Sequence, residues 1–416
     1  MRVYVLTPSF PPTDGGQEKH LLELSESLIA AGACVQVFSR RVDPSFAPAE
    51  RMGSVPVMRF GPCGEIKGVG LAAVPRLVAL LCKMTWRLIR DRRRYDIVLV
   101  SGFNFMPMCA VVARAFTGKP CVVRPESPLE ISEPLGERSR EKLGLTERSL
   151  AVRVLRRLRR DSARRVDRYV AISAEIRGKL EQAGIAADRI VAVPNGIDME
   201  RYGMVSTEAK GALRRALGLP PGALLMIYTG RLAVSKGVMT LIEAWRELAP
   251  EFPAAHLLLV GTGRGSFDDC EPALLAYIDR HALARTVTLT GSVPNVHEYL
   301  KASDLFVFSS DYEGFSLSIL EAMSVGLPLV STRVGIAAEL EAHAEFGLLV
   351  PPKDERALRD ALRTLLPDAD RRAAMGRAAR SLVQSQYSLG AEAGRYLDLF
   401  GTLTASMTDR SRPDRA

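Results

Sequence analysis

The sequence has no run of about 18 apolar residues, the length that a membrane-spanning helix requires. The longest uncharged run, Ile97–Ala113, is interrupted by glycine, asparagine and proline, which favours a strand, a loop and the start of a helix. A proline cluster follows Arg2 so closely that no apolar core of a signal peptide fits before it. We therefore expect the protein to begin at Met1 and to work in the cytoplasm.

The sequence also lacks paired cysteines and typical metal-binding motifs. None of its six cysteines stands at CxxC spacing, which argues against a zinc site or a disulfide framework and favours free thiols in a reducing compartment. The single Asp-x-Asp, Asp368–Asp370, follows Pro367 and precedes a helical pattern, so we interpret it as a helix cap. We expect no metal and no cofactor.

Acidic residues are scarce in one half of the chain. Residues 1–200 contain 32 Lys and Arg against 22 Asp and Glu, whereas residues 201–416 contain 24 against 25. The net charge of +9 therefore comes from the first half, which predicts that this half faces something anionic.

Two basic stretches in that half have helical spacing. In Arg153–Arg168 several arginines recur three and four residues apart, and in Leu71–Arg94 basic residues alternate with an apolar stripe. Each stretch could be an ordinary solvated or core-covering helix, or a surface for an anionic membrane. Nucleic acid is a weaker interpretation, because the first stretch contains no aromatic residue and Tyr169 alone follows it directly.

The hydrophobic pattern predicts two series of alternating strands and helices. The first opens with a strand at Val3–Leu6, a loop with Gly15 and Gly16, and an amphipathic helix that ends near Gly32. A second series starts after a polar stretch near residue 200. The predicted fold is α/β, with two doubly wound parallel-sheet domains. We expect domains at 1–198 and 199–387, a helix at 388–400 that returns to the first domain, and a disordered tail at 401–416.

Two glutamates eight residues apart give the strongest indication of a site. Glu313 follows a predicted strand, and Glu321 lies about one turn into the next helix. The backbone N–H groups of Ser316–Ser318 would open that helix and point toward an anion. One carboxylate could bind sugar hydroxyls and the other a ribose, although an isolated pair of this kind is more often an ordinary surface feature.

A second loop carries cations. Arg231 and Lys236 lie between Gly230 and Gly237, directly after another predicted strand, and together suit a diphosphate. They could neutralise the charge on a leaving nucleoside diphosphate, a task otherwise given to a metal. An exposed basic loop is an equally good interpretation of this segment by itself. Gly16 would let the backbone approach a phosphate or sugar closely.

Taken together, these motifs resemble the family 4 glycosyltransferases, which have the GT-B fold of two Rossmann-like domains facing across a cleft. The resemblance covers nearly the whole chain and rests on PPTDGGQEKHLLELSESLIAAG at 11–32, YVAISAEI at 169–176, VPNGID at 193–198, TGRLAVSKGVMTLIEA at 229–244, LLLVGTG at 257–263, DLFVFSSDYEGFSLSILEAMSVGLPLVST at 304–332 and GLLVPPKD at 347–354.

The resemblance implies transfer of a sugar from a nucleotide sugar, with UDP or GDP as the expected nucleotide, and with retention of anomeric configuration. By this likeness Arg231 and Lys236 hold the diphosphate, and Glu313 contacts the donor sugar. The other implied donor contacts are Gly16, Gly230, Gly314, Phe315, Ser316, Leu317 and, at the ribose, Glu321. The base would lie near Gly261, Thr262, Val293 and Asn295.

The acceptor side departs from the family pattern. Many members have a histidine after each of two strands of the first domain, where this chain has Asn104 and Arg124–Ser127. His20 is the only histidine of the first half. By position, the candidates on this side are His20, Asn104, Arg124 and Glu126, with Glu126 as a base or as a structural partner of Arg124.

We therefore predict a retaining, metal-independent glycosyltransferase that acts by front-face attack in preference to a covalent intermediate. Its acceptor would be a glycan or lipid-linked saccharide at the inner face of the cytoplasmic membrane, as in polysaccharide biosynthesis of the cell envelope. A soluble transferase making a small glycoside is one alternative. A basic nucleic-acid-binding protein that keeps the fold as a scaffold is another, though we expect no nucleic-acid partner.

Overall fold

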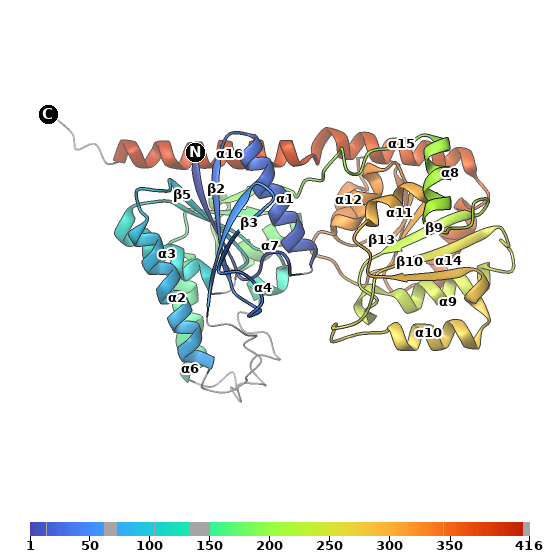
Figure 1. The fold of residues 1–416 in the computed structure, drawn as a ribbon, viewed down its shortest axis with the longest axis horizontal. Helices are drawn as coiled ribbons and strands as arrows, with labels where there is room; N and C mark the ends of the chain where they lie inside the picture. The colour runs from blue at the N-terminus through green and yellow to red at the C-terminus, as the bar shows by residue number, and fades with distance from the viewer. Residues whose placement is uncertain (14, 62–72, 104, 133–149, 344, 411–416) are drawn as a thin grey trace. The chain divides into compact units, whose positions relative to one another are not determined.

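The computed structural model describes all residues except 14, 62–72, 104, 133–149, 344 and 411–416. The chain divides into two compact units (Figure 1). The first comprises Met1–Gly196 together with the segment from Leu389 onward, and the second comprises Ile197–Ser388. The chain thus leaves the first unit once and returns to it once.

The first unit is built on an eight-stranded sheet in the order β3-β4-β2-β1-β5-β6-β7-β8. Among the described strands of this sheet, β3 alone runs antiparallel to its neighbour. The central strand β5 is buried throughout, as expected for a parallel sheet covered on both faces. The strands are β1 (Arg2–Thr7), β2 (Cys34–Arg40), β3 (Ala49–Met52), β4 (Val55–Phe60), β5 (Ile97–Ser101), β6 (Cys121–Arg124), β7 (Arg168–Ala171) and β8 (Ile190–Ala192).

Helices cover both faces of this sheet. Strand order and right-handed crossovers place α1 on one face and α2, α3 and α6 on the other. Helix α16 packs against α1 (Figure 1). The described helices are α1 (Gly16–Ala30), α2 (Ala73–Arg90), α3 (Met106–Thr117), α4 (Pro128–Ser132), α6 (Leu150–Ala163), α7 (Ala174–Gln182), the 3-10 turn η1 (Ala187–Arg189) and α16 (Leu389–Arg410).

The second unit has a six-stranded parallel sheet in the order β11-β10-β9-β12-β13-β14. Its core centres on Trp245 and on strand residues such as Leu257 and Val307. The strands are β9 (Leu224–Thr229), β10 (Ala255–Val260), β11 (Val287–Gly291), β12 (Leu305–Phe308), β13 (Leu329–Thr332) and β14 (Gly347–Val350).

The helices of the second unit alternate with these strands. Asp368 caps α15, accepting a hydrogen bond from the Arg371 backbone N–H at 2.9 Å, which confirms its predicted capping role. The helices are α8 (Thr207–Ala216), η2 (Val234–Lys236), α9 (Val238–Leu248), α10 (Glu271–Arg280), η3 (Leu283–Arg285), α11 (Val296–Ala302), α12 (Leu317–Ser324), α13 (Gly335–Leu340), α14 (Glu355–Leu365) and α15 (Ala369–Gln386).

The prediction of a disordered tail from residue 401 is wrong as far as Arg410. Helix α16 continues to that residue, and the last six residues lie outside the described part of the chain. Tyr396, Phe400 and Leu403 are buried and recur four and three residues apart, so they form one apolar face. That face packs onto the first unit and holds the helix beyond residue 400.

Each sheet has a point where the direction of strand addition reverses. In the first unit the reversal lies between β1 and β5, and in the second it lies between β9 and β12. Such switch points open a crevice at the carboxyl ends of the two strands, where open α/β sheets bind their ligands. The side chains that follow these four strands are therefore the first to examine.

Candidate functional site

The switch point of the second unit brings two predicted residues together. Lys236 follows β9 and Glu313 follows β12, and the Lys236 Nζ lies 2.5 Å from Glu313 Oε1. The same carboxylate oxygen accepts a hydrogen bond from Ser310 Oγ at 2.8 Å. The side chains remain 19% and 13% exposed, so a ligand can reach the pair.

Close backbone packing holds the lysine loop at this edge. Gly237 has φ of 62°, and a Cβ atom there would lie 1.9 Å from the Ser309 carbonyl oxygen. Only glycine fits such a position. Ser309 Oγ in turn donates to the Lys236 carbonyl at 3.0 Å. The loop after β9 is thus fixed directly to the end of β12.

Arg231 lies on the same loop but is exposed. Its Nη1 is 3.4 Å from Ser266 Oγ, a long hydrogen bond. Tyr228 anchors the loop from below by donating to the Arg231 carbonyl at 2.9 Å. Burial, with a smaller contribution from Glu313, raises the pKa of Tyr228, so the phenol stays neutral and keeps donating.

Asp268 supports this loop from the next strand connection, a role that sequence reasoning missed. Its Oδ2 accepts hydrogen bonds from Ser235 Oγ at 2.5 Å and from the Ser235 backbone N–H at 3.1 Å. Desolvation opposes ionisation, but the hydrogen bonds from Ser235 and Ser266 together outweigh it and lower the pKa of Asp268 to about 2. The carboxylate is therefore charged at neutral pH.

Helix α12 begins beside Glu313 with an unusual backbone. Ser316 has φ of 79°, rare for a residue other than glycine, and its side chain makes no capping hydrogen bond to the helix. Ser316 Oγ instead lies 3.2 Å from Ser318 Oγ. Gly314 and Leu317 are partly exposed here, and Phe315 is buried.

Glu321 lies further along α12 and has a partner that the sequence did not indicate. Tyr202, which is buried, donates its phenol to Glu321 Oε1 at 2.6 Å. This contact orients the carboxylate from a segment 119 residues earlier in the chain.

The residues predicted around the base follow the adjacent strands β10 and β11. Gly261 pairs with Gly291, and a Cβ at Gly261 would lie 1.9 Å from the Gly230 carbonyl oxygen. Thr262 donates to Glu271 at 2.6 Å, and Asn295 donates to Glu298 at 2.5 Å. Val293 is partly exposed.

The first unit has a small cavity at its own switch point, with a volume of about 30 Å³. Room of that size holds roughly one water molecule. Glu126 lies in its wall, 8% exposed, and accepts a hydrogen bond from Ser101. The lining residues are Thr7, Pro8, Ser9, Gln17, Glu18, Leu21, Ser101, Gly102, Glu126 and Glu130.

His20 is placed behind this cavity in a buried polar cluster. Its Nε2 lies 3.0 Å from Glu392 Oε2, and its Nδ1 lies 3.1 Å from Arg124 Nη2. Because arginine can only donate, Nδ1 is the acceptor and Nε2 carries the hydrogen that Glu392 accepts. Arg124 also donates to Asn195 at 2.8 Å and lies 3.4 Å from Glu126. At 1% exposure, His20 is enclosed by these partners.

Two further predicted residues complete the first unit. Gly16 is exposed and is the first residue of α1, directly after the loop that follows β1. Asn104 lies outside the described residues.

Within the described part of the chain, no three His, Cys, Asp or Glu side chains form a group that could hold a metal ion. No described helix is both long and apolar enough to cross a membrane.

Comparison with family models identifies the chain. The model for Glycosyltransferase Family 4 matches residues 14–201, and the model for Glycosyl transferases group 1 matches residues 201–382. The two matches are contiguous and cover most of the chain, so it belongs to the family 4 glycosyltransferases, as the sequence motifs predicted. The protein is therefore a glycosyltransferase.

Similar curated proteins act on different substrates. A D-inositol 3-phosphate glycosyltransferase of Geodermatophilus obscurus is 25% identical, over 85% of this chain and 78% of that protein. A lipopolysaccharide core biosynthesis mannosyltransferase of Rhizobium meliloti is 31% identical, over 51% of this chain and 58% of that protein. For a D-inositol 3-phosphate glycosyltransferase of Corynebacterium urealyticum, 32% identical, the match spans about half of each chain.

Solved structures show the same fold. Sucrose-phosphate synthase of Thermosynechococcus elongatus superposes with a TM-score of 0.78 at 22% identity, covering 97% of this chain and 99% of the other. The Anabaena protein HepE in complex with UDP-glucose gives 0.75 at 21% identity, covering 97% and 100%. The GT-B fold expected from the sequence is confirmed.

Proposed function

We propose that this protein transfers a sugar from a nucleotide-sugar donor to a glycan or lipid-linked saccharide, with retention of configuration and without a metal ion. The observation that carries the proposal is the Lys236–Glu313 pair at the switch point of the second unit. A cation and a carboxylate next to each other suit the two parts of a sugar diphosphate, the phosphate and the hydroxyl-bearing ring.

In this proposal the donor replaces contacts that the side chains now make with each other. Lys236 turns from Glu313 to the diphosphate, and Arg231 adds a second cation from the exposed start of the loop. Glu313 then accepts hydrogen bonds from the donor sugar, steadied by Ser310. The two cations offset the charge that develops on the leaving diphosphate, which is the role a metal would otherwise have.

The start of α12 and Glu321 hold the nucleotide part. The backbone N–H groups after Ser316 lack a side-chain cap, so they are suited to a phosphate oxygen at the positive end of the helix. Glu321, oriented by Tyr202, accepts from the ribose hydroxyls. The base lies toward Gly261 and Asn295. UDP and GDP are the nucleotides we expect.

The first unit holds the acceptor. Glu126, at the cavity of the β1–β5 switch point, is the side chain we assign to the attacking hydroxyl. Arg124 and Ser101 orient this carboxylate. The basic excess of this unit supports an acceptor at the anionic cytoplasmic face of the membrane.

The test is release of nucleoside diphosphate from UDP- and GDP-sugars with EDTA present, in the wild type and in Glu313→Gln. Loss of a contact made in the transition state predicts a drop in kcat/KM of about 100-fold or more. Glu341→Gln is the matched control, since Glu341 forms an exposed ion pair with Arg333 at 2.7 Å elsewhere in the same unit. Equal activity of the two variants would contradict the proposal.

A further inference from the structure

The outer helical layer of the first unit has a strongly one-sided charge. Helices α2, α3 and α6 together contain ten Lys and Arg residues and one acidic residue, Asp161. Their net charge equals the +9 of the whole chain, so the remaining residues sum to zero. This layer is therefore a region of concentrated positive charge.

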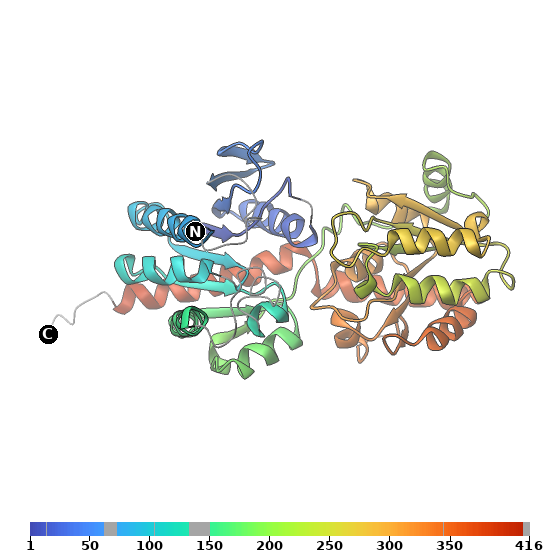
Figure 2. The same cartoon turned by 90° about the horizontal axis from the view of Figure 1, so that it is seen from below.

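Exposed apolar side chains lie among these charges. Trp86 on α2 is 59% exposed and Phe116 on α3 is 69% exposed, far more than large apolar residues usually are. Val78, Val112 and Leu158 are each about half exposed on the same three helices. Helix α3 contacts both α2 and α6, so these side chains belong to one surface (Figure 2 shows α2 and α3 side by side).

The two aromatic residues lie near the same end of the layer. Helix α2 leads into β5 and helix α3 leads into β6, and these two strands are parallel. The carboxyl ends of the two helices therefore point the same way. Trp86 and Phe116 lie close to those ends. The Arg90 guanidinium stacks 5.1 Å from the centre of the Trp86 ring. Tryptophan is enriched where proteins meet the membrane–water interface, and a neighbouring cation suits the anionic headgroups there.

A hollow of about 460 Å³ opens beside this stack. It is lined by Ile89, Arg90, Arg92, Arg93 and Arg94, so four of its five lining residues are arginines. Guanidinium binds phosphate oxygens with paired hydrogen bonds. The hollow thus has the size and charge for a phosphate-bearing headgroup.

We infer that the surface of α2, α3 and α6 binds an anionic phospholipid bilayer, with Trp86 and Phe116 inserted at the interface and Arg90–Arg94 on the headgroups. Cationic and apolar side chains together fit a membrane surface, where each finds its preferred medium. A nucleic acid would use the charges but leave Val78, Val112 and Leu158 exposed to water. The inference deepens the proposed function by giving the enzyme a means to reach a membrane-bound acceptor.

Binding of the purified full chain to vesicles tests this inference without any sugar. The vesicles are pure phosphatidylcholine or phosphatidylcholine with phosphatidylglycerol, and sedimentation measures the partition coefficient. We expect binding only to the anionic vesicles, weakening steeply as salt rises. The triple variant Arg92→Gln, Arg93→Gln, Arg94→Gln should lower the partition coefficient about 100-fold, at about fivefold for each charge. Its control is Arg280→Gln, Arg356→Gln, Arg377→Gln on the second unit.

A second pair of variants tests the apolar part. Trp86→Ser with Phe116→Ser should lower the partition coefficient at least tenfold at constant charge, whereas Leu275→Ser, an exposed residue of α10, should leave it unchanged. The inference fails if the wild type ignores anionic vesicles, if the control variants lose as much binding, or if RNA or duplex DNA displaces the vesicles at equal phosphate concentration. These results leave the nucleotide-release assay unaffected, so the two proposals fail separately.

Discussion

Glu392 lies where the two segments that connect the units meet, one leaving the first unit and the other returning to it. It is fully buried, and its Oε2 accepts hydrogen bonds from His20 and from the backbone N–H of Gly196, the last residue before the chain leaves the first unit. Glu392 itself follows the return of the chain by only a few residues. One carboxylate therefore fixes the departing and the returning segments together.

Removing this carboxylate should destabilise the first unit. Glu392→Ala leaves the buried Arg124 with one nearby negative charge fewer and leaves His20 without its hydrogen-bond acceptor. The loss should lower the free energy of unfolding by about 3 kcal/mol. Glu392→Gln should cost less, because its amide oxygen still accepts a hydrogen bond. Urea unfolding at neutral pH measures both variants, and a loss for alanine no greater than that of an exposed control such as Glu181→Ala would contradict this account.

The same residue predicts a pH dependence. Burial opposes ionisation of Glu392, but His20, Arg124 and the Gly196 N–H together hold its pKa below the usual value. Its contribution is therefore complete above the ordinary glutamate pKa of about 4.3 and is lost as the pH falls through the lower folded value. The difference in the free energy of unfolding between wild type and Glu392→Gln should stay constant from pH 7 to 5 and become smaller below pH 5. A gap that widens on acidification would refute the assignment.

Single residues also show what the sequence could not reveal. Lys236 and Glu313 were predictable because each follows a strand within a recognisable motif. Tyr202 and Glu392 were not, because their partners lie 119 and 372 residues away along the chain. The burial of His20 beside Glu392 was not predictable either, since a sequence gives its position after β1 but not its partner on α16.

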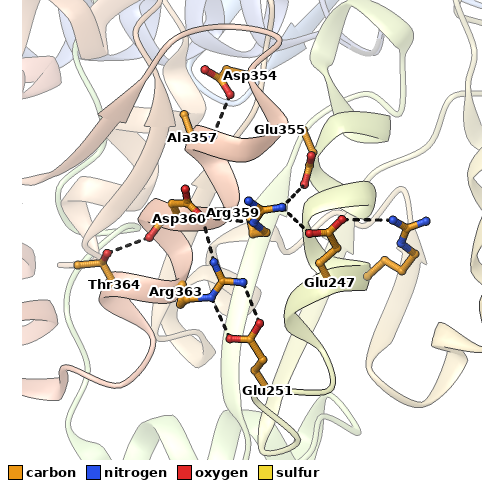
Figure 3. Close-up of polar contacts among 10 residues, drawn as sticks. Glu247, Glu251, Asp354, Glu355, Ala357, Arg359, Asp360, Arg363 and Thr364 are labelled. Carbon is orange, nitrogen blue, oxygen red and sulfur yellow. Dashed lines mark hydrogen bonds and ion pairs between the residues drawn. The ribbon is translucent and has the colours of Figure 1, made fainter.

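At the scale of elements, a surface network joins α9 to α14. Arg363 binds both oxygens of Glu251 at 2.8 and 2.9 Å, and Arg359 contacts Glu247, as Figure 3 shows. Hydrogen bonds from Arg363 hold the pKa of Glu251 below its usual value. Beneath the network, Leu362 of the same helix is fully buried in the core.

Substitutions at these two neighbours should destabilise the protein to very different extents. Leu362→Ala should cost about 3 kcal/mol, because it leaves a cavity in a packed core. Arg363→Ala should shift the melting temperature far less, and the shift should vanish in 1 M salt, because exposed ion pairs are screened. Thermal unfolding in low and high salt measures both. Similar losses for the two variants would mean that the network, and not the core, joins the helices.

The elements themselves were largely predictable where burial was complete. β5 and β10 are buried along their whole length, so continuous apolar runs marked them. The short strand β3 was missed, because it pairs at the sheet edge and its sequence AERM carries no apolar pattern. The end of α16 was missed because its buried residues Phe400 and Leu403 are separated by glycine and threonine, which hides the apolar pattern.

At the scale of the whole molecule, the two switch points present different kinds of side chain. The second unit presents cations and carboxylates suited to a nucleotide sugar, and the first presents a carboxylate-lined cavity with a basic outer layer. One relative is named for D-inositol 3-phosphate and another for lipopolysaccharide core biosynthesis, so family membership alone does not give the acceptor.

The central claim is that the second unit binds a nucleotide without a metal. Isothermal titration of the full chain with UDP, GDP, ADP and dTDP in EDTA tests it most directly, with Glu321→Ala as the variant. We predict that UDP or GDP binds well below millimolar concentration and that the variant weakens this binding at least tenfold, since it loses hydrogen bonds from the ribose to a charged group. Absence of binding by all four nucleotides, or equal binding by the variant, would contradict the account.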